Sequence, residues 1–378
     1  MNLYTAQHKY YCGIDLHTRF MFICVINGDG EILYHKNHRA NGSNLLRALR
    51  PFREDVVVCA ECMYTWYWLA DLCAEEDITF VLGHAAGMRM IHGAKTKSDK
   101  LDSEKIARLL AAHMIPESYA YPSGMRETRS LLRRRMGLVS TRADFLAHLT
   151  CIRQQYNLEP LPRNQSRKNS RKGILESYPE GDISRLAEVD VQVVDQLEPI
   201  ISDLEEYIEN RAMITDPVVL KLLRSVPGIG KILGLVMMYE IHDIARFKSE
   251  KQFSSYSRLI GCQAESGGKK LGVKGRKVGN VYLKWAFNEA AMIFLRGNKT
   301  AEKFKRRLEN KHGKARMYSI VAHRLGVTIY HMLKNRQAFN IYRFLGQQAP
   351  KRTPEVAIGK RKQRLARADK ECVMNAPA

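Results

Sequence analysis

Long apolar runs are missing from this chain of 378 residues. A helix that crosses a membrane needs about eighteen or more consecutive apolar residues, and no such stretch occurs. The opening segment, MNLYTAQHKYYCGID, also lacks the apolar core of a secretory signal peptide. These absences predict a cytoplasmic protein that has no membrane partner.

Paired cysteines are also scarce, because only Cys59 and Cys62 among the eight cysteines have the CxxC spacing. A structural zinc site needs four ligands, and no second pair follows to complete one. We therefore interpret the cysteines as buried, reduced thiols rather than as metal ligands.

Acidic residues are too few to balance the basic ones, since 39 stand against 61 and leave a net charge of +22. The excess is segregated: residues 1–110 hold 13 basic and 13 acidic side chains, whereas residues 221–378 hold 34 and 10. A merely soluble surface explains a net charge but not this segregation. The pattern indicates a polyanionic partner, and nucleic acid is the partner that such basic regions commonly bind.

The first 120 residues alternate strand and helix signals and form the first expected domain. The turn sequence NGDG at residues 27–30 predicts a hairpin between two strands. The expected elements, in chain order, are strands at 11–18, 19–26 and 31–38, a helix that Ser43 caps, a strand at 56–61, a helix that contains Trp66, Trp68 and Leu69, a strand at 78–83 and a helix at 95–110. The order β-β-β-α-β-α-β-α is that of the ribonuclease H fold.

Residues 121–215 have a different pattern, which predicts a basic helix over 125–156 followed by an acidic helix. Apolar residues at roughly heptad spacing in both helices favour an antiparallel coiled-coil hairpin. Pro199 lies inside the acidic helix and is expected to kink or split it.

Residues 216–346 predict a third, mostly helical domain, so the expected fold class is α/β plus all-α. The sequence PGIG at residues 227–230 separates two apolar helices. It suits either a helix-hairpin-helix element, whose turn binds a phosphate, or an ordinary turn between helices. Residues 347–378 are basic and poor in apolar side chains, which predicts a flexible, phosphate-binding tail.

Four carboxylates stand where a ribonuclease H fold would bring them together. Asp15 and Glu61 belong to apolar strands, and Asp99 and Asp102 share one helix face through i, i+3 spacing. Converging carboxylates repel one another unless a cation binds them, and Mg²⁺ or Mn²⁺ prefers such oxygen ligands. The alternative for Asp99 and Asp102 is that they merely complement the helix dipole.

The acidic order resembles the RuvC-like DEDD domain of the IS one-hundred-and-ten family of insertion-sequence transposases. Residues 253–291 resemble the second domain of that family, with Ser266-Gly-Gly and then Lys277-Val-Gly-Asn as markers. The resemblance covers roughly residues 8–340. This chain lacks the proline that often precedes the serine, and Lys284 stands where an arginine is common.

The resemblance implies a bacterial, nucleoid-associated DNA transposase with Ser266 as the nucleophile, which would leave a phosphoserine link to DNA. It implies Mg²⁺ or Mn²⁺ as the cofactor, donor and target DNA and a structured bridge RNA as partners, and a homodimer or homotetramer. No histidine adjoins Ser266 in sequence to activate the hydroxyl, so activation would come from the metal held by the acids. The side chains expected to bind nucleic acid are Lys95, Lys97, Lys100, Lys269, Lys270, Lys274, Arg276, Lys277 and Asn280.

Two other functions stay open. One is a RuvC-like junction nuclease that uses the carboxylates alone, in which case Ser266 is a residue of a glycine turn. The other is a non-catalytic nucleic-acid-binding protein in which the acids are structural. The hydroxyl groups that compete with Ser266 for the role of nucleophile belong to Ser254, Ser255, Tyr256 and Ser257.

Overall fold

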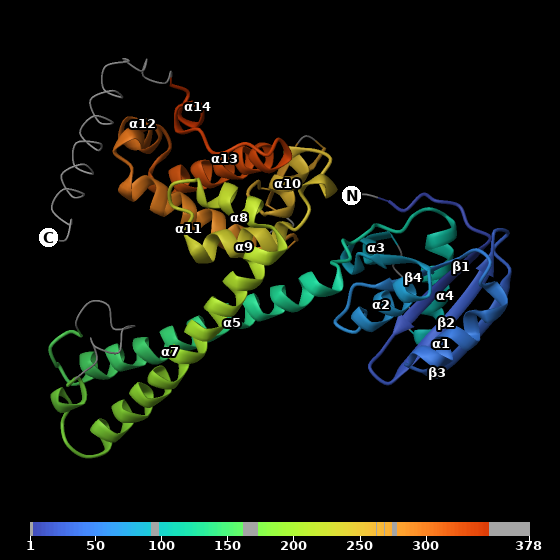
Figure 1. Ribbon diagram of the computed structural model, residues 1–378, viewed down its shortest axis with the longest axis horizontal. Coiled ribbons are helices and arrows are strands. Elements are labelled where there is room, and N and C mark those ends of the chain that lie inside the picture. The colour runs from blue at the N-terminus through green and yellow to red at the C-terminus, as the bar shows by residue number, and fades with distance from the viewer. Residues whose placement is uncertain are drawn as a thin grey trace, which may run out of the picture. The chain divides into compact units, whose positions relative to one another are not determined.

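The computed structural model divides the chain into two compact units, Met1–Thr128 and Arg129–Ala378 (Figure 1). It describes residues 3–91, 98–161, 173–261, 263–267, 269–273 and 278–347. The expected tail at 347–378 therefore lies outside the described residues, apart from residue 347. None of the helices in the described ranges is both long and apolar enough to cross a membrane.

The first unit is a mixed α/β domain built on one five-stranded sheet. Its strands are β1 (Tyr10–Leu16), β2 (Phe20–Asn27), β3 (Ile32–Arg39), β4 (Val56–Glu61) and β5 (Thr79–Gly83). Its helices are α1 (Gly42–Leu49), the short η1 (Arg50–Phe52), α2 (Tyr67–Glu75), α3 (Ala85–Ile91) and α4 (Asp99–Ala111), and α5 (Ser123–Gln155) begins here. All five predicted strands are confirmed to within two residues at either end.

The order of strands in the sheet is β3-β2-β1-β4-β5. β1 pairs antiparallel with β2 and parallel with β4, so β1 is the central strand and β4 lies beside it. This is the arrangement that the predicted element order requires. Two details were not predicted: the cap of α1 is Asn41 rather than Ser43, and α3 occupies a segment expected to be a loop.

Two hydrophobic cores cover the opposite faces of this sheet. Cys12 and Ile14 of β1 pack in the core that contains residues of α1 and α2. Tyr11 of β1 packs in the other core, which contains residues of α3 and α4. Because side chains alternate along a strand, Asp15 lies on the face that α4 covers.

α4 approaches β1 unusually closely at Gly13. A Cβ atom on Gly13 would lie 2.3 Å from the backbone nitrogen of Ala107 and 2.3 Å from the backbone oxygen of Ser103. Real side chains do not tolerate such distances, so only glycine permits α4 to pack on the strand here. This contact fixes the height of α4, and therefore of its first turn, above the sheet.

We expect Gly13→Ala to destabilise the first unit by about 3 kcal/mol, because the backbone atoms it would meet cannot turn aside as a side chain can. Urea unfolding of the full chain measures this change. Gly28→Ala is the matched control, since a Cβ there meets nothing within 4 Å. Equal unfolding midpoints for the two variants would contradict the role of the close approach.

The second unit begins with an antiparallel helical hairpin made by α5 and α7 (Asp182–Thr215). Arg135 of α5 bonds Glu205 of α7, and His148 further along α5 bonds Asp190 nearer the start of α7. The pairing runs in opposite directions along the two helices, as predicted. Of the kink or split expected at Pro199, the split is wrong, because α7 continues through that residue. The kink stays a prediction.

The remainder of the second unit is mostly helical, as predicted. Its elements are η2 (Leu175–Ser177), α8 (Pro217–Arg224), α9 (Lys231–Ile241), η3 (Ile244–Arg246), α10 (Glu250–Tyr256), β6 (Gln263–Ser266), β7 (Lys269–Val273), α11 (Val281–Gly297), η4 (Lys299–Ala301), α12 (Glu302–His312), α13 (Lys314–Lys334) and α14 (Ile341–Leu345). The turn between α8 and α9 packs on α11, where a Cβ on Gly228 would lie 2.8 Å from the backbone nitrogen of Phe294. That contact gives the glycine turn a packing role.

A buried carboxylate, Glu240 of α9, joins three elements of this unit. It accepts hydrogen bonds from Arg129 at 2.9 Å and from Arg133 at 2.6 and 2.9 Å, both on α5. Asn280, at the start of α11, donates a further bond of 2.7 Å. Burial alone would raise the pKa of Glu240, but the hydrogen bonds and charges of the two arginines outweigh it and hold the pKa below its ordinary value.

Glu240→Ala should destabilise the second unit by about 3–5 kcal/mol, because it leaves two guanidinium groups without their buried partner. Denaturant unfolding measures this change. Glu302→Ala, which breaks an exposed i, i+4 pair with Arg306 on α12, serves as the control and should change stability by less than about 1 kcal/mol. Equal changes for both variants would refute the structural role of Glu240.

Candidate active site

Asp15 lies near the end of the central strand, two residues after Gly13, and its side chain is 20% exposed. Glu61 ends the neighbouring strand β4, in which Val57 and Cys59 belong to the core under α4. Alternation along β4 therefore places Glu61 on the same sheet face as Asp15. The register Ile14 to Ala60 sets the two acids at the same level of the sheet.

The first turn of α4 brings two more acids to this face. Ser98 caps the helix by accepting a hydrogen bond from the backbone N–H of Leu101 at 3.3 Å. Asp99 and Asp102 follow in the first turn, where the helix dipole favours negative charge. Lys105 donates to Asp102 at 2.9 Å, so this lysine partly neutralises the acid.

Asp15, His17 and Asp99 form a tight cluster of candidate metal ligands. The Nε2 atom of His17 lies 3.2 Å from a carboxylate oxygen of Asp15 and 3.5 Å from one of Asp99. One ligand atom from each residue lies within 4.8 Å of the other two. Two carboxylates and an imidazole at this spacing suit a divalent cation such as Mg²⁺ or Mn²⁺.

The electrostatics of Asp15 agree with this geometry. Burial raises the pKa of Asp15 above its ordinary value, and the negative charges of Asp99 and Asp102 raise it further, although His17 opposes the shift. Ionising Asp15 is therefore less favourable in the folded protein than in the unfolded chain. A bound cation would relieve that cost, and this is how an acidic cluster of this kind favours metal binding.

Glu61 and Asp102 lie outside the tight cluster of Asp15, His17 and Asp99. Asp102 is close enough to influence the pKa of Asp15, and its side chain is 24% exposed. Glu61 is half-buried at the end of its strand. The roles of all four acids as metal ligands remain a prediction, and the geometry brings Asp15 and Asp99 together most closely.

The cationic residues predicted to bind nucleic acid, some beside the acids and some after Ser266, are only partly within the described structure. Lys95, Lys97, Lys274, Arg276 and Lys277 lie outside the described residues. Lys100 is exposed on the first turn of α4, which leaves its ammonium group accessible to a phosphate.

Ser266 ends β6 in a two-stranded hairpin that the sequence reasoning did not foresee. Ser266 pairs with Lys269 in the register of the hairpin, and Lys270 of β7 pairs with Glu265. Gly267 follows the serine with a φ of +57°, a conformation that glycine adopts without strain. The predicted glycine turn is therefore confirmed, and the serine stands at the edge of that turn. Of the hydroxyl groups that compete with it, those of Ser254 and Ser257 are buried.

Asn280 is buried, and its amide is already engaged within the fold. Its side-chain oxygen accepts from the backbone N–H groups of Tyr282 and Leu283, which caps α11. Its nitrogen donates to Glu240. Binding of nucleic acid by Asn280 stays a prediction, but these contacts give the residue a structural role.

Comparison with known proteins connects this geometry to a family. A family model described as the DEDD transposase domain of IS110 matches residues 12–157, which include all four acids. A second model, described as transposase of the IS116/IS110/IS902 family, matches residues 220–306, which include Ser266. The chain belongs to the IS110/IS116 family of insertion-sequence transposases.

A relative supports this assignment over most of the chain. The transposase for insertion sequence element IS1111A of Coxiella burnetii is 21% identical over 334 residues, which cover 86% of this chain and 90% of that protein. The similarity therefore extends through both units and the hairpin rather than being confined to one motif.

His17 is the residue of this transposase that sequence reasoning missed. It directly follows β1, two positions after Asp15, and its exposed imidazole bridges Asp15 and Asp99. The signal was present, because a histidine just beyond the end of a strand that carries a candidate ligand can reach the same site. Only the position of α4 shows that Asp99 is its second partner.

We expect Mn²⁺ to raise the melting temperature of the transposase, because an ion that binds only the folded state stabilises it by about 2.7 kcal/mol at a hundred times its Kd. Asp15→Asn should abolish this gain, whereas Asp29→Asn, in an exposed turn, should retain it. In EDTA, where no ion is bound, we expect Asp15→Asn to be more stable than the parent chain. The raised pKa of Asp15 means that the stability of the parent chain falls as pH rises through that pKa, and the variant avoids this loss. Equal Mn²⁺ responses in both variants would exclude the cluster as the site.

Proposed function

We propose that this protein is the DNA-cleaving and strand-exchanging recombinase of an insertion sequence. The observation that carries the proposal is the convergence of Asp15, His17 and Asp99 within 4.8 Å, on a sheet whose order is that of ribonuclease H-like nucleases. The family assignment supports DNA as the substrate.

The acids Asp15, Glu61, Asp99 and Asp102, together with His17, would hold Mg²⁺ or Mn²⁺. When bound, such an ion supplies Lewis-acid polarisation of a phosphodiester and lowers the pKa of a coordinated hydroxyl group. The protein contributes the rigid placement of its ligands, because Asp15 is fixed by the central strand and Asp99 by the packing of α4 on Gly13. Lys100 can hold a neighbouring phosphate of the strand.

Ser266 is the proposed nucleophile. Its Oγ would form a bond to the scissile phosphorus as the bond to the departing DNA oxygen breaks, and the serine proton would pass to that oxygen. The phosphoserine link conserves the energy of the broken bond, so attack by a second DNA end can reverse the step and exchange strands. The position of Ser266 beside a glycine of positive φ supports this role, since a phosphate can approach the backbone there.

A structured bridge RNA is the proposed guide, and a homodimer or homotetramer the proposed assembly. Base pairing would select donor and target DNA, while the protein holds the RNA by its shape and backbone. The 34 basic side chains among residues 221–378 support a large phosphate-binding surface. The helical hairpin of α5 and α7 is a reasonable interface between protomers.

A second candidate is a RuvC-like junction nuclease that uses the acids alone. The observation that favours it is that the metal-ligand cluster is complete within the first unit and needs no residue of the second. In that case no covalent link forms between protein and DNA, and Ser266 only shapes its hairpin.

The two candidates predict different products for Ser266→Ala. We expect this variant to fold and to bind nucleic acid but to lose strand exchange, together with the DNA that remains attached to protein after phenol extraction. Ser255→Ala, an exposed serine of α10, is the control and should keep both. Asp15→Asn should lose cleavage under either candidate. If Ser266→Ala still recombines DNA, the serine mechanism is wrong and the nuclease candidate gains support.

A further inference from the structure

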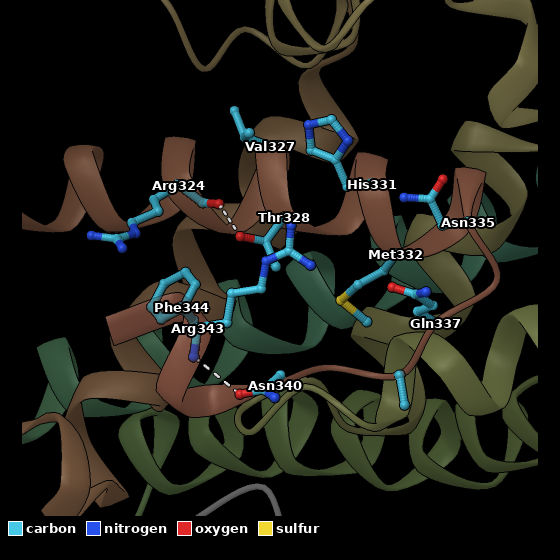
Figure 2. Close-up of a pocket in the computed structure, with 11 residues that line it drawn as sticks. Arg324, Val327, Thr328, His331, Met332, Asn335, Gln337, Asn340, Arg343 and Phe344 are labelled. Carbon is cyan, nitrogen blue, oxygen red and sulfur yellow. Dashed lines mark hydrogen bonds between the residues drawn. The ribbon is translucent and has the colours of Figure 1, made fainter. Parts of the chain in front are cut away.

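A cavity of about 470 Å³ lies between α13, α14 and the segment that joins them, all in the second unit. Figure 2 shows its lining, with Arg324, Thr328 and Met332 contributed by α13 and Arg343 and Phe344 by α14. Neither the acidic cluster nor the hairpin of Ser266 contributes to it. The cavity therefore needs an explanation of its own.

One side of the cavity gathers positive charge. Arg324 lies over the rings of Phe304 and Phe344, at 5.2 and 5.1 Å from their centres, and Arg307 lies over the same Phe304 ring at 5.7 Å. Two guanidinium groups on one ring repel each other. Among the described residues no acid pairs with Arg307, Arg324 or Arg343. Arg324 and Arg343 line the cavity, and a guanidinium group without an acid partner attracts an anion such as a phosphate.

The other side offers uncharged hydrogen-bonding groups. Asn335 and Gln337 are exposed, and within the described ranges neither amide has a hydrogen-bond partner. Figure 2 shows both near Met332, at the end of the cavity away from Arg324. By contrast, Asn340 caps α14 and His331 bonds Glu250 at 2.6 Å. The two amides are therefore available to a ligand, and each can both donate and accept.

The lining between these two sides is apolar, because Met332 and Phe344 contribute to it. A phosphate needs the guanidinium groups, a flat apolar body suits the wall, and a base edge needs donors and acceptors like the amides. A nucleotide combines all three in one unit. An acidic peptide supplies the charge, and its backbone can also pair with the amides, but its carboxylate side chains bring no flat body for the apolar wall.

We propose that this cavity binds one unpaired nucleotide of a nucleic-acid strand, with its phosphate at Arg324 and Arg343 and its base edge at Asn335 and Gln337. The inference rests on the proposed function only in taking nucleic acid as the ligand. The site is separate from the acidic cluster and from Ser266, so it binds and positions the strand and takes no part in the chemistry.

Binding of short, fluorescently labelled single strands of DNA and of RNA to the full chain, in EDTA, tests the proposal without cleavage. Arg343→Gln should weaken binding about tenfold, because a charge-assisted hydrogen bond contributes roughly 1.5 kcal/mol or more. Arg316→Gln removes the same charge from an exposed position of α13 outside the cavity. It should weaken binding no more than about twofold, as expected when only the general electrostatic attraction is reduced. Thermal unfolding confirms that both variants fold.

A second variant tests recognition of the base. Gln337→Ala should reduce the preference of the protein among strands of different bases, while a strand with abasic sites should bind the parent and this variant equally. The DNA and RNA arms show which kind of strand supplies the nucleotide. Three outcomes would each overturn the proposal. The first is an equal loss of binding in Arg343→Gln and Arg316→Gln, and the second is that the parent chain binds abasic strands as tightly as complete ones. The third is that polyglutamate competes as strongly as an oligonucleotide does.

These outcomes are distinct from failure of the proposed function. A chain that binds strands through the cavity but never cleaves DNA in Mg²⁺ would contradict the recombinase alone. A chain that cleaves and exchanges DNA with an unchanged response to Arg343→Gln would contradict the cavity alone.

Discussion

The contact between α4 and Gly13 is the constraint on which the acidic site depends. The backbone of Ser103 and Ala107 lies where any side chain on Gly13 would have to go, so α4 rests directly on the central strand. The helix begins one turn before that contact, and its first turn therefore stands beside the end of β1. The distance between Asp15 and Asp99 is set by packing rather than by any attraction between the two acids, which repel each other.

In the second unit Glu240 likewise fixes how helices pack together, but it does so through hydrogen bonds and charge rather than through close backbone contact. Its two arginines come from α5 and its amide partner, Asn280, caps α11. A buried ion pair contributes less to stability than its geometry suggests, because both ions lose hydration. Its clearer effect is on geometry, since the bonds from Arg129, Arg133 and Asn280 tie α5 and α11 to one carboxylate of α9. Asn280 comes after the hairpin of Ser266 in the chain. Its bond to Glu240 therefore also fixes the position at which the chain enters α11.

Sequence reasoning predicted the strands because turn signals and apolar runs mark them, and Asp15 and Glu61 stand in two of those runs. Tyr11, Gly13 and Asp15 alternate with Cys12 and Ile14, and that alternation alone decides which face Asp15 occupies. Sequence reasoning failed where the deciding contact joins residues distant in sequence, and where two nearby residues were equally suitable as a helix cap. The partnership of His17 with Asp99 depends on the position of α4, and the cap of α1 at Asn41 was decided between two acceptable cap residues. The continuity of α7 through Pro199 shows that packing against α5 can outweigh the loss of one helical hydrogen bond.

The arginines of this transposase differ in whether an acid of the fold neutralises them. The sequence predicts a basic helix over 125–156, yet within α5 Arg129 and Arg133 bind Glu240 and Arg135 binds Glu205. These cations are neutralised within the fold and add little to the attraction for phosphate. By contrast, Arg307 of α12 and Arg324 of α13 lie over two aromatic rings, and Arg343 of α14 lines the cavity beside them. Among the described residues no acid pairs with these three arginines. Net charge therefore overstates the cations of the hairpin that are available to phosphate, and the unpaired cations of the carboxy-terminal helices are the ones on which the proposed nucleotide site depends.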